Sequence, residues 1–255
     1  TFNVSWLKYG SDDAPLSVHL KDGTVQSVSR ASWANWASHK GTETLKDQVK
    51  YIEVYSSNEM LKYINIIDTP GLDATSKVDS ENTIDFLRTV HPDAVILLFS
   101  KSLSDDTLKL IQEFQCSESN ISFSLNPMNA LGILSKVDAN WSVVQDNDII
   151  STSQNAINRT LSSRSDVNKS LFRILPVSAL MGLASSYITD EDYCAFKSLA
   201  NLDDKNLIRL HISYDFFIRE YDFISISPNQ RLLLISKYGL YGCYTCIKAI
   251  KDKNE

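Results

Sequence analysis

Strand-length apolar runs recur along the chain and alternate with longer amphipathic stretches. The runs at 63–67, 94–99, 130–134 and 171–177 are almost continuously apolar, which is typical of strands buried on both faces of a sheet. Between them, apolar residues at helical spacing predict a capped amphipathic helix from Ser104, and a polar stretch from about Val144 to Leu161 is also expected to be helical. This alternation predicts an α/β fold with a doubly wound, mostly parallel sheet and right-handed crossovers.

Nearer the N-terminus, apolar and polar residues alternate singly. This alternation predicts half-buried strands at 2–7, 16–20 and 49–55. The Asp22-Gly23 turn predicts a hairpin after the second of these strands. Trp33 and Trp36 lie at helical spacing, so we expect a short helix whose tryptophans pack in the core or at an interface rather than form a stacking platform. The strand at 49–55 is closely followed by the next apolar run, which indicates an antiparallel edge on the sheet.

From Met181 onwards the pattern is almost entirely helical. Ser227-Pro228-Asn229-Gln230 predicts a helix start, because Ser can cap the helix, Pro suits its first position and Gln can close a capping box. The sequence contains no repeat, no low-complexity tract and no clear linker. We therefore expect residues 1–255 to form a single domain with added helices over about 181–255.

Composition narrows the possible classes of function. Hydrophobic residues make up 43% and charged residues 22%, the balance of an ordinary soluble globular protein. A net charge of −6 disfavours a nucleic-acid binder, which usually needs a basic surface. No apolar run is long enough to cross a bilayer, no secretory signal is visible, and 4 cysteines are too few for a disulfide scaffold. We expect a cytoplasmic protein with no nucleic-acid partner.

Three short polar motifs each follow a predicted buried strand, so we expect them at the same edge of the sheet. They are Asp68-Thr69-Pro70-Gly71, Ser135-Lys136-Val137-Asp138 and Ser178-Ala179-Leu180. In the first, the carboxylate lies where open α/β sheets bind ligands, and the bare amide of Gly71 lets a phosphate oxygen approach the backbone. Each motif alone also fits a plain strand-end turn or a solvated loop, but their shared order argues against coincidence.

The second motif suits recognition of guanine. Guanine presents N1–H and N2–H₂ side by side, and the carboxylate of Asp138 can accept from both, whereas adenine lacks this paired donor edge. The methylene stem of Lys136 would lie along the base plane. The backbone N–H of Ala179, in a tight turn, would face guanine O6 and disfavour an amino group there.

The order of the motifs, each after a strand, resembles the GTPase superfamily. The preceding segment is similar to dynamin-like proteins, notably bacterial ones: a strand ending in Tyr9-Gly10, a Lys-Asp-Gly hairpin, a short helix and an Ile-Glu-Val strand. Leu72, where signalling GTPases often have a catalytic Gln, and the segment Ser236-Lys237-Tyr238-Gly239-Leu240 also fit this group. The resemblance covers most of the chain.

The resemblance implies a GTPase domain that hydrolyses GTP by in-line attack of water on the γ-phosphate. Asp68 would hold Mg²⁺ through water, and the Gly71 amide would bind the γ-phosphate, which makes both catalytic. The rest of the nucleotide site would consist of Thr69, Pro70, Ser135, Lys136, Asp138, Ser178 and Ala179. The resemblance also implies GTP and GDP as ligands, a homodimer through GTPase domains, and membrane remodelling at a peripheral location through segments outside this chain.

One part of the family's pattern does not occur in these 255 residues, the phosphate-binding Gly-x-x-x-x-Gly-Lys-Ser/Thr loop. We expect this loop to precede the strand at Phe2, in a GTPase domain truncated at its N-terminus, because the chain begins inside a strand-like pattern without Met. The alternative is a non-catalytic interaction module, a pseudo-GTPase that keeps the fold without turning over nucleotide. A phosphate loop upstream would favour the enzyme.

Cys243-Tyr244-Thr245-Cys246 has the spacing of a metal or redox motif, but no second ligand pair accompanies it. Both cysteines fall on one helix face with Ile247 and Ile250, so we expect them to pack as small apolar residues. His211 has no acid or cysteine motif around it, and we expect a structural role.

Overall fold

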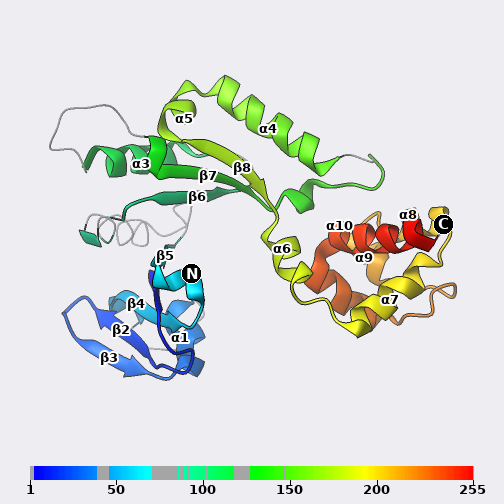
Figure 1. Cartoon of the computed structure of the whole chain (residues 1–255), viewed down its shortest axis with the longest axis horizontal. Coiled ribbons are helices and arrows are strands. Elements are labelled where there is room, and N and C mark those ends of the chain that lie inside the picture. Colours follow the sequence, from blue (N-terminus) through cyan, green and yellow to red (C-terminus); the bar gives the residue numbers. More distant parts are fainter. Residues whose placement is uncertain are drawn as a thin grey trace. The chain divides into compact units, whose positions relative to one another are not determined.

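The computed structural model describes residues 3–38, 46–70, 86, 89–90, 92–100, 103–117, 127–145 and 148–254. The chain divides into two compact units, Thr1–Asp93 with Asp105–Ser124, and Ala94–Ser104 with Leu125–Glu255 (Figure 1). Each unit has its own sheet. The expectation of a single domain over 1–255 stays a prediction.

The first unit is built on a five-stranded sheet of order β3-β2-β4-β1-β5. Its strands are β1 (Ser5–Tyr9), β2 (Leu16–Leu20), β3 (Val25–Val28), β4 (Val49–Ser56) and β5 (Ile66–Asp68). β1 runs parallel to β4, and the other pairings in this sheet are antiparallel. The strands predicted from single alternation are confirmed, within a few residues at their ends, and this sheet is mixed rather than mostly parallel.

The Asp22-Gly23 turn joins β2 to β3 as predicted. Gly23 has a φ of 89°, which a residue without Cβ adopts readily. The carboxylate of Asp22 accepts from the backbone N–H of Thr24 at 2.8 Å, and the N–H of Leu20 donates to the carbonyl of Thr24 at 2.8 Å. Local turn chemistry therefore fixes the pairing of these two strands.

The core of the first unit lies between the sheet and α1 (Trp33–Ala37). Trp36 is 3% exposed and packs with apolar side chains of β2 and β4, which confirms the predicted core tryptophan. The helix α3 (Asp105–Ser117) buries the face predicted from its spacing, with Leu108, Ile111 and Phe114 all buried. The described ranges of the first unit also contain the short 3₁₀ helices η1 (Arg30–Ser32), η2 (Lys46–Gln48) and η3 (Glu59–Lys62).

The prediction of a strand at 63–67 buried on both faces is wrong. Asn58 caps η3 by accepting from the N–H of Met60 at 3.0 Å, so the chain turns before the strand begins. Tyr63 is 86% exposed and Ile64 is 47% exposed, and β5 covers only Ile66–Asp68. β1 lies between β4 and β5, so β4 and β5 are not neighbours. Because β1 is parallel to β4 and antiparallel to β5, β4 and β5 run in opposite directions.

The second unit contains a three-stranded sheet of order β6-β7-β8, and both of its pairings are parallel. Its strands are β6 (Val95–Phe99), β7 (Ala130–Ser135) and β8 (Arg173–Val177), which confirms the predicted parallel strands in this unit. In β6, however, Ile96 is 64% and Leu98 67% exposed, so the apolar run is not buried on both faces. The doubly wound arrangement of the whole chain stays a prediction.

Helices make up the rest of the second unit. They are η4 (Pro127–Asn129), η5 (Val137–Asn140), α4 (Ile149–Ser163), α5 (Ser165–Ser170), α6 (Ala179–Ser185), α7 (Asp190–Ala200), α8 (Asp204–Leu210), α9 (Tyr214–Ile218) and α10 (Pro228–Asn254). Figure 1 shows α6 leading from the end of β8 to the cluster of α7 to α10. That cluster has its own apolar core, centred on residues such as Phe196, Phe217 and Ile247.

The start of α10 follows the predicted capping box. Gln230 N donates to Ser227 Oγ at 3.3 Å, and the backbone N–H of Ser227 donates to Gln230 Oε1 at 3.1 Å. Pro228 is the first residue of the helix. No helix in the described ranges combines the length and the apolar character needed to cross a bilayer.

Candidate functional site at the end of the parallel sheet

The motif Ser135-Lys136-Val137-Asp138 forms a tight turn at the end of β7. Ser135 is the last residue of the strand, and its Oγ donates to the carbonyl of Phe99 in β6 at 3.1 Å. Lys136 then takes a φ of 56° and a ψ of 37°, and it is the only non-glycine residue with positive φ in the described part of the chain. The left-handed residue turns the chain into η5, whose Val137 is buried and anchors the loop.

The carboxylate of Asp138 is half-buried and has no partner among the residues that the structure describes. Within the described residues it makes no hydrogen bond and no ion pair, and the exposed ammonium of Lys136 makes none either. A partly buried carboxylate is usually paired, because desolvation penalises a charge without partners. The acceptor positions of Asp138 are therefore open to a ligand.

Ser178 and Ala179 follow β8 at the same edge of the sheet. Ser135 lies opposite Val177 in the parallel register, so Ser178 is one residue beyond the point where β7 ends. Its Oγ accepts from the N–H of Met181 at 3.3 Å and caps α6, and exposed Ala179 is the first residue of that helix. The second and third motifs thus lie side by side at one edge, as predicted.

The first motif belongs to the other unit. Asp68 is the exposed last residue of β5 and pairs with Ser5 of β1. Thr69 is half-buried and Pro70 is buried, whereas Gly71 lies outside the described residues. Asp68 ends a strand of the five-stranded sheet, whereas the other two motifs follow strands of the three-stranded sheet. The prediction that all three motifs lie at the edge of one sheet is therefore wrong.

The donors of the first motif suit Mg²⁺. Mg²⁺ prefers oxygen ligands, keeps several waters and often takes only one or two carboxylates together with substrate phosphates. An exposed carboxylate such as that of Asp68 fits this mode, in which a cluster of protein ligands is not required. In the described ranges no group of three or more His, Cys, Asp or Glu side chains is placed to hold a metal ion.

The end of the parallel sheet also contacts α10, which the sequence reasoning missed. The ring of Trp141, directly after η5, lies 4.8 Å from the ring of Tyr244 and 5.4 Å from that of Tyr241 between centroids. Gly239 of α10 lies beside Asp138 and Leu180. A glycine inside a helical pattern was the one available signal of this contact.

Two other reactive side chains, those of His211 and Cys243, are buried in the core. His211 is fully buried, its Nδ1 lies 2.9 Å from the carbonyl of Leu207, and burial lowers its pKa to about 4. Cys243 is fully buried, and burial raises the pKa of its thiol. Cys246 is half-buried and free. The packing role predicted for Cys243 and the structural position predicted for His211 are confirmed.

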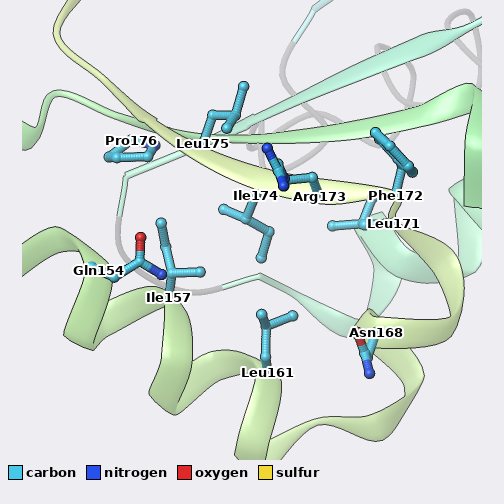
Figure 2. A pocket seen from close by; sticks show the side chains of 10 residues that line it. All are labelled: Gln154, Ile157, Leu161, Asn168, Leu171, Phe172, Arg173, Ile174, Leu175 and Pro176. Carbon is cyan, nitrogen blue, oxygen red and sulfur yellow. The ribbon is translucent and has the colours of Figure 1, made fainter.

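A groove of about 490 Å³ lies between α4 and β8 (Figure 2). Figure 2 shows Ile157 and Leu161 of α4 facing Ile174 of β8 across it. The polar side chains that line it are Gln154, Asn168 and Arg173, and none of the predicted site residues does so. The groove is a gap in the apolar layer between helix and strand rather than the predicted nucleotide site.

The described residues define a mixed α/β protein whose parallel strands end in a loop with an unpaired carboxylate. No profile of a known protein family matches the chain. The Isoniazid-induced protein IniC of Mycobacterium tuberculosis, from strains CDC 1551 / Oshkosh and ATCC 25618 / H37Rv, is 22% identical over 200 residues. That alignment covers 75% of this chain and 38% of IniC.

Among solved structures, the chain is similar to two chains of an oligomerised bacterial dynamin pair, described as providing a mechanism for long-range sensing and tethering of membranes. The TM-score is 0.43 for both, with 18% and 16% identity, over 86% of this chain and 38% of theirs. The chain therefore spans 38% of the length of each of these relatives. At this distance, the likeness assigns neither a family nor an activity.

Proposed function

We propose that this chain is the GTP-binding and GTP-hydrolysing domain of a dynamin-like protein. The observation that supports the proposal most directly is the carboxylate of Asp138, which makes no hydrogen bond or ion pair within the described residues and follows β7, while Ser178 and Ala179 follow the neighbouring parallel strand β8 at the same edge. The order of the sequence motifs, with Asp68-Thr69-Pro70-Gly71 before the other two, adds to it.

In this proposal the loops after β7 and β8 recognise guanine. The carboxylate of Asp138 accepts from guanine N1–H and N2–H₂, and the stem of Lys136 lies along the base. The backbone N–H of Ala179 donates to guanine O6, and the cap formed by Ser178 holds that turn in place. Adenine does not present two N–H donors side by side, so the Asp138 carboxylate would lose its paired hydrogen bonds. We therefore expect discrimination against ATP.

The triphosphate end of the site would use the first motif. Asp68 would hold Mg²⁺ through water, and the Gly71 amide would donate to the γ-phosphate, with Thr69 and Pro70 shaping the turn. Bound Mg²⁺ would neutralise charge that develops on the phosphate oxygens during in-line attack of water. The β-phosphate would need a phosphate-binding loop, a motif that these 255 residues do not contain.

The cellular role would follow that of dynamin-like proteins. We propose that GTPase domains pair as homodimers and that the full protein acts peripherally at a membrane, which it remodels. The solved bacterial dynamin pair is described as an oligomer that senses and tethers membranes. This part of the proposal concerns the whole protein, since the chain spans 38% of that structure's length.

Nucleotide titration tests the proposal. The natural protein at full length, and this chain alone, are titrated with fluorescent GTP and ATP analogues in the presence of Mg²⁺, and phosphate release is then measured. Asp138→Asn should weaken GTP binding by at least about tenfold and relax discrimination toward xanthine nucleotides, since an amide N–H₂ would face a guanine donor.

The matched control is Asp190→Asn, which removes the same charge from an exposed position on α7. It should leave GTP affinity unchanged. Equal GTP affinity in the Asp138 variant and the wild type would refute the guanine site. Guanine-selective binding without phosphate release would instead favour the non-catalytic module.

A further inference from the structure

The helix α10 is interrupted in the middle. Gly239 has a φ of 70° and a ψ of 172°, which is a conformation that essentially only glycine adopts. The half before it is fixed to α7, because Lys237 and Tyr238 both donate to the carboxylate of Asp192. The break therefore redirects a helix whose first half is anchored.

The break faces both loops of the proposed guanine site. A Cβ placed on Gly239 would lie 3.1 Å from Cδ2 of Leu180, which follows Ser178 and Ala179. The same Cβ would lie 3.8 Å from Oδ2 of Asp138. Gly239 thus leaves room for Leu180 at the start of α6 and lies within contact distance of the carboxylate.

The second half of α10 contacts the Asp138 loop again. Trp141, three residues after Asp138, packs its ring against Tyr244 and Tyr241. The carboxylate of Asp138 makes no hydrogen bond of its own in the described residues, so packing of its loop decides where it points. The residues that provide this packing lie about a hundred positions later in the sequence.

We propose that Gly239 is a positioning residue for guanine recognition: the break in α10 holds Leu180 and the Asp138 carboxylate in the arrangement that reads the base. This inference rests on the proposed function. A side chain at 239 would strain the backbone and push on Leu180, and through Leu180 it would disturb the turn at Ser178 and Ala179, while its Cβ would meet the carboxylate only at ordinary contact distance. Base selectivity should then fall although every recognition motif is intact.

The experiment compares GDP with IDP on the full-length natural protein. Hypoxanthine, the base of inosine diphosphate (IDP), lacks the exocyclic amino group of guanine, so the affinity ratio of GDP to IDP reports the hydrogen bond from that group to the carboxylate. Partial unfolding lowers both affinities equally and leaves the ratio unchanged. Gly239→Ala should lower the ratio by about tenfold, the range of one hydrogen bond to a charged group.

The matched control is Gly182→Ala in α6, where a new Cβ would meet nothing within 4 Å. It should keep the wild-type ratio. If Gly239→Ala fails to fold, Leu180→Ala changes the side chain that faces Gly239 without straining the backbone, with exposed Leu183→Ala on the same helix as its control. The ratio should fall in Leu180→Ala and not in Leu183→Ala.

The outcomes separate this inference from the proposed function. Suppose that the wild type prefers GDP and that the GDP-to-IDP ratio is unchanged in Gly239→Ala. The positioning role is then overturned and the proposed function stands. If Gly239→Ala does not fold, an unchanged ratio in Leu180→Ala has the same meaning. If the wild type binds no guanine nucleotide, the proposed function fails and Gly239 has no such role. A lowered ratio with both controls unchanged supports the inference.

Discussion

Replacing Asp192 by Asn should destabilise the second unit at neutral pH, and by about half as much at pH 3. The carboxylate lies in the first turn of α7 and accepts hydrogen bonds from Lys237 Nζ and from Tyr238 Oη, the latter at 2.7 Å. It also accepts from the backbone N–H of Thr189 at 3.1 Å, which closes a capping box. One side chain therefore both caps α7 and ties it to α10.

The pKa of Asp192 sets the expected magnitude. Burial alone would raise this pKa, but the hydrogen bonds from Lys237, Tyr238 and Thr189 outweigh burial and lower it from 3.8 to about 2. Because the folded pKa is below the unfolded one, the ionised carboxylate stabilises the fold above about pH 4, and this contribution is lost as the pH falls through 2. The difference corresponds to about 2 kcal/mol at pH 7 and about half of that at pH 3.

Urea unfolding followed by circular dichroism at pH 7 and pH 3 measures this contribution. Asp190→Asn is the control, because Asp190 loses the same charge in the same helical turn but is exposed and has no side-chain partner in the described residues. It should change the free energy of unfolding by less than about 0.5 kcal/mol. Equal destabilisation by both variants, or an Asp192 effect that is as large at pH 3 as at pH 7, would refute the reasoning.

Two further predictions concern the same unit. Stability should fall by about 3 kcal/mol between pH 6.5 and pH 4, because burial lowers the pKa of His211 to about 4 and the unfolded chain takes up the proton first. His211→Phe should flatten this part of the pH–stability curve in urea titrations, and an equally steep curve would contradict the assignment. Ser227→Ala should cost about 1 kcal/mol through loss of the α10 cap. In thermal unfolding, exposed Ser236→Ala within the same helix should change stability less, and equal effects would argue against the cap.

Features set by neighbouring residues could be predicted from the sequence. The hairpin at Asp22-Gly23 and the start of α10 at Ser227 depend on turn and capping chemistry within four residues, and both are confirmed. The parallel strands β7 and β8 come from continuous apolar runs, and their register brings Ser135 and Ser178 to one edge. These local signals were sufficient to predict the position of two of the three motifs.

The strand before Asp68 shows why an apolar run is a weaker signal than a cap. The run from Tyr63 to Ile67 has the composition of a buried strand, but Asn58 directs the preceding residues into η3. Only Ile66–Asp68 is then left to pair with β1, and Tyr63 remains exposed. Periodicity describes which residues are apolar, whereas pairing partners decide which of them are covered.

The geometry around Asp138 could not be predicted from its own motif, because residues far away in the sequence pack against the Asp138 loop. The motif supplies the carboxylate and the left-handed Lys136 that turns the loop, both of which act locally. The orientation of the carboxylate depends on Gly239 and on the rings that hold Trp141, which belong to a helix that the sequence presents as an independent element. Chains with the same three motifs but a different residue at 239 should therefore differ in base selectivity, because the same carboxylate would be held in a different direction.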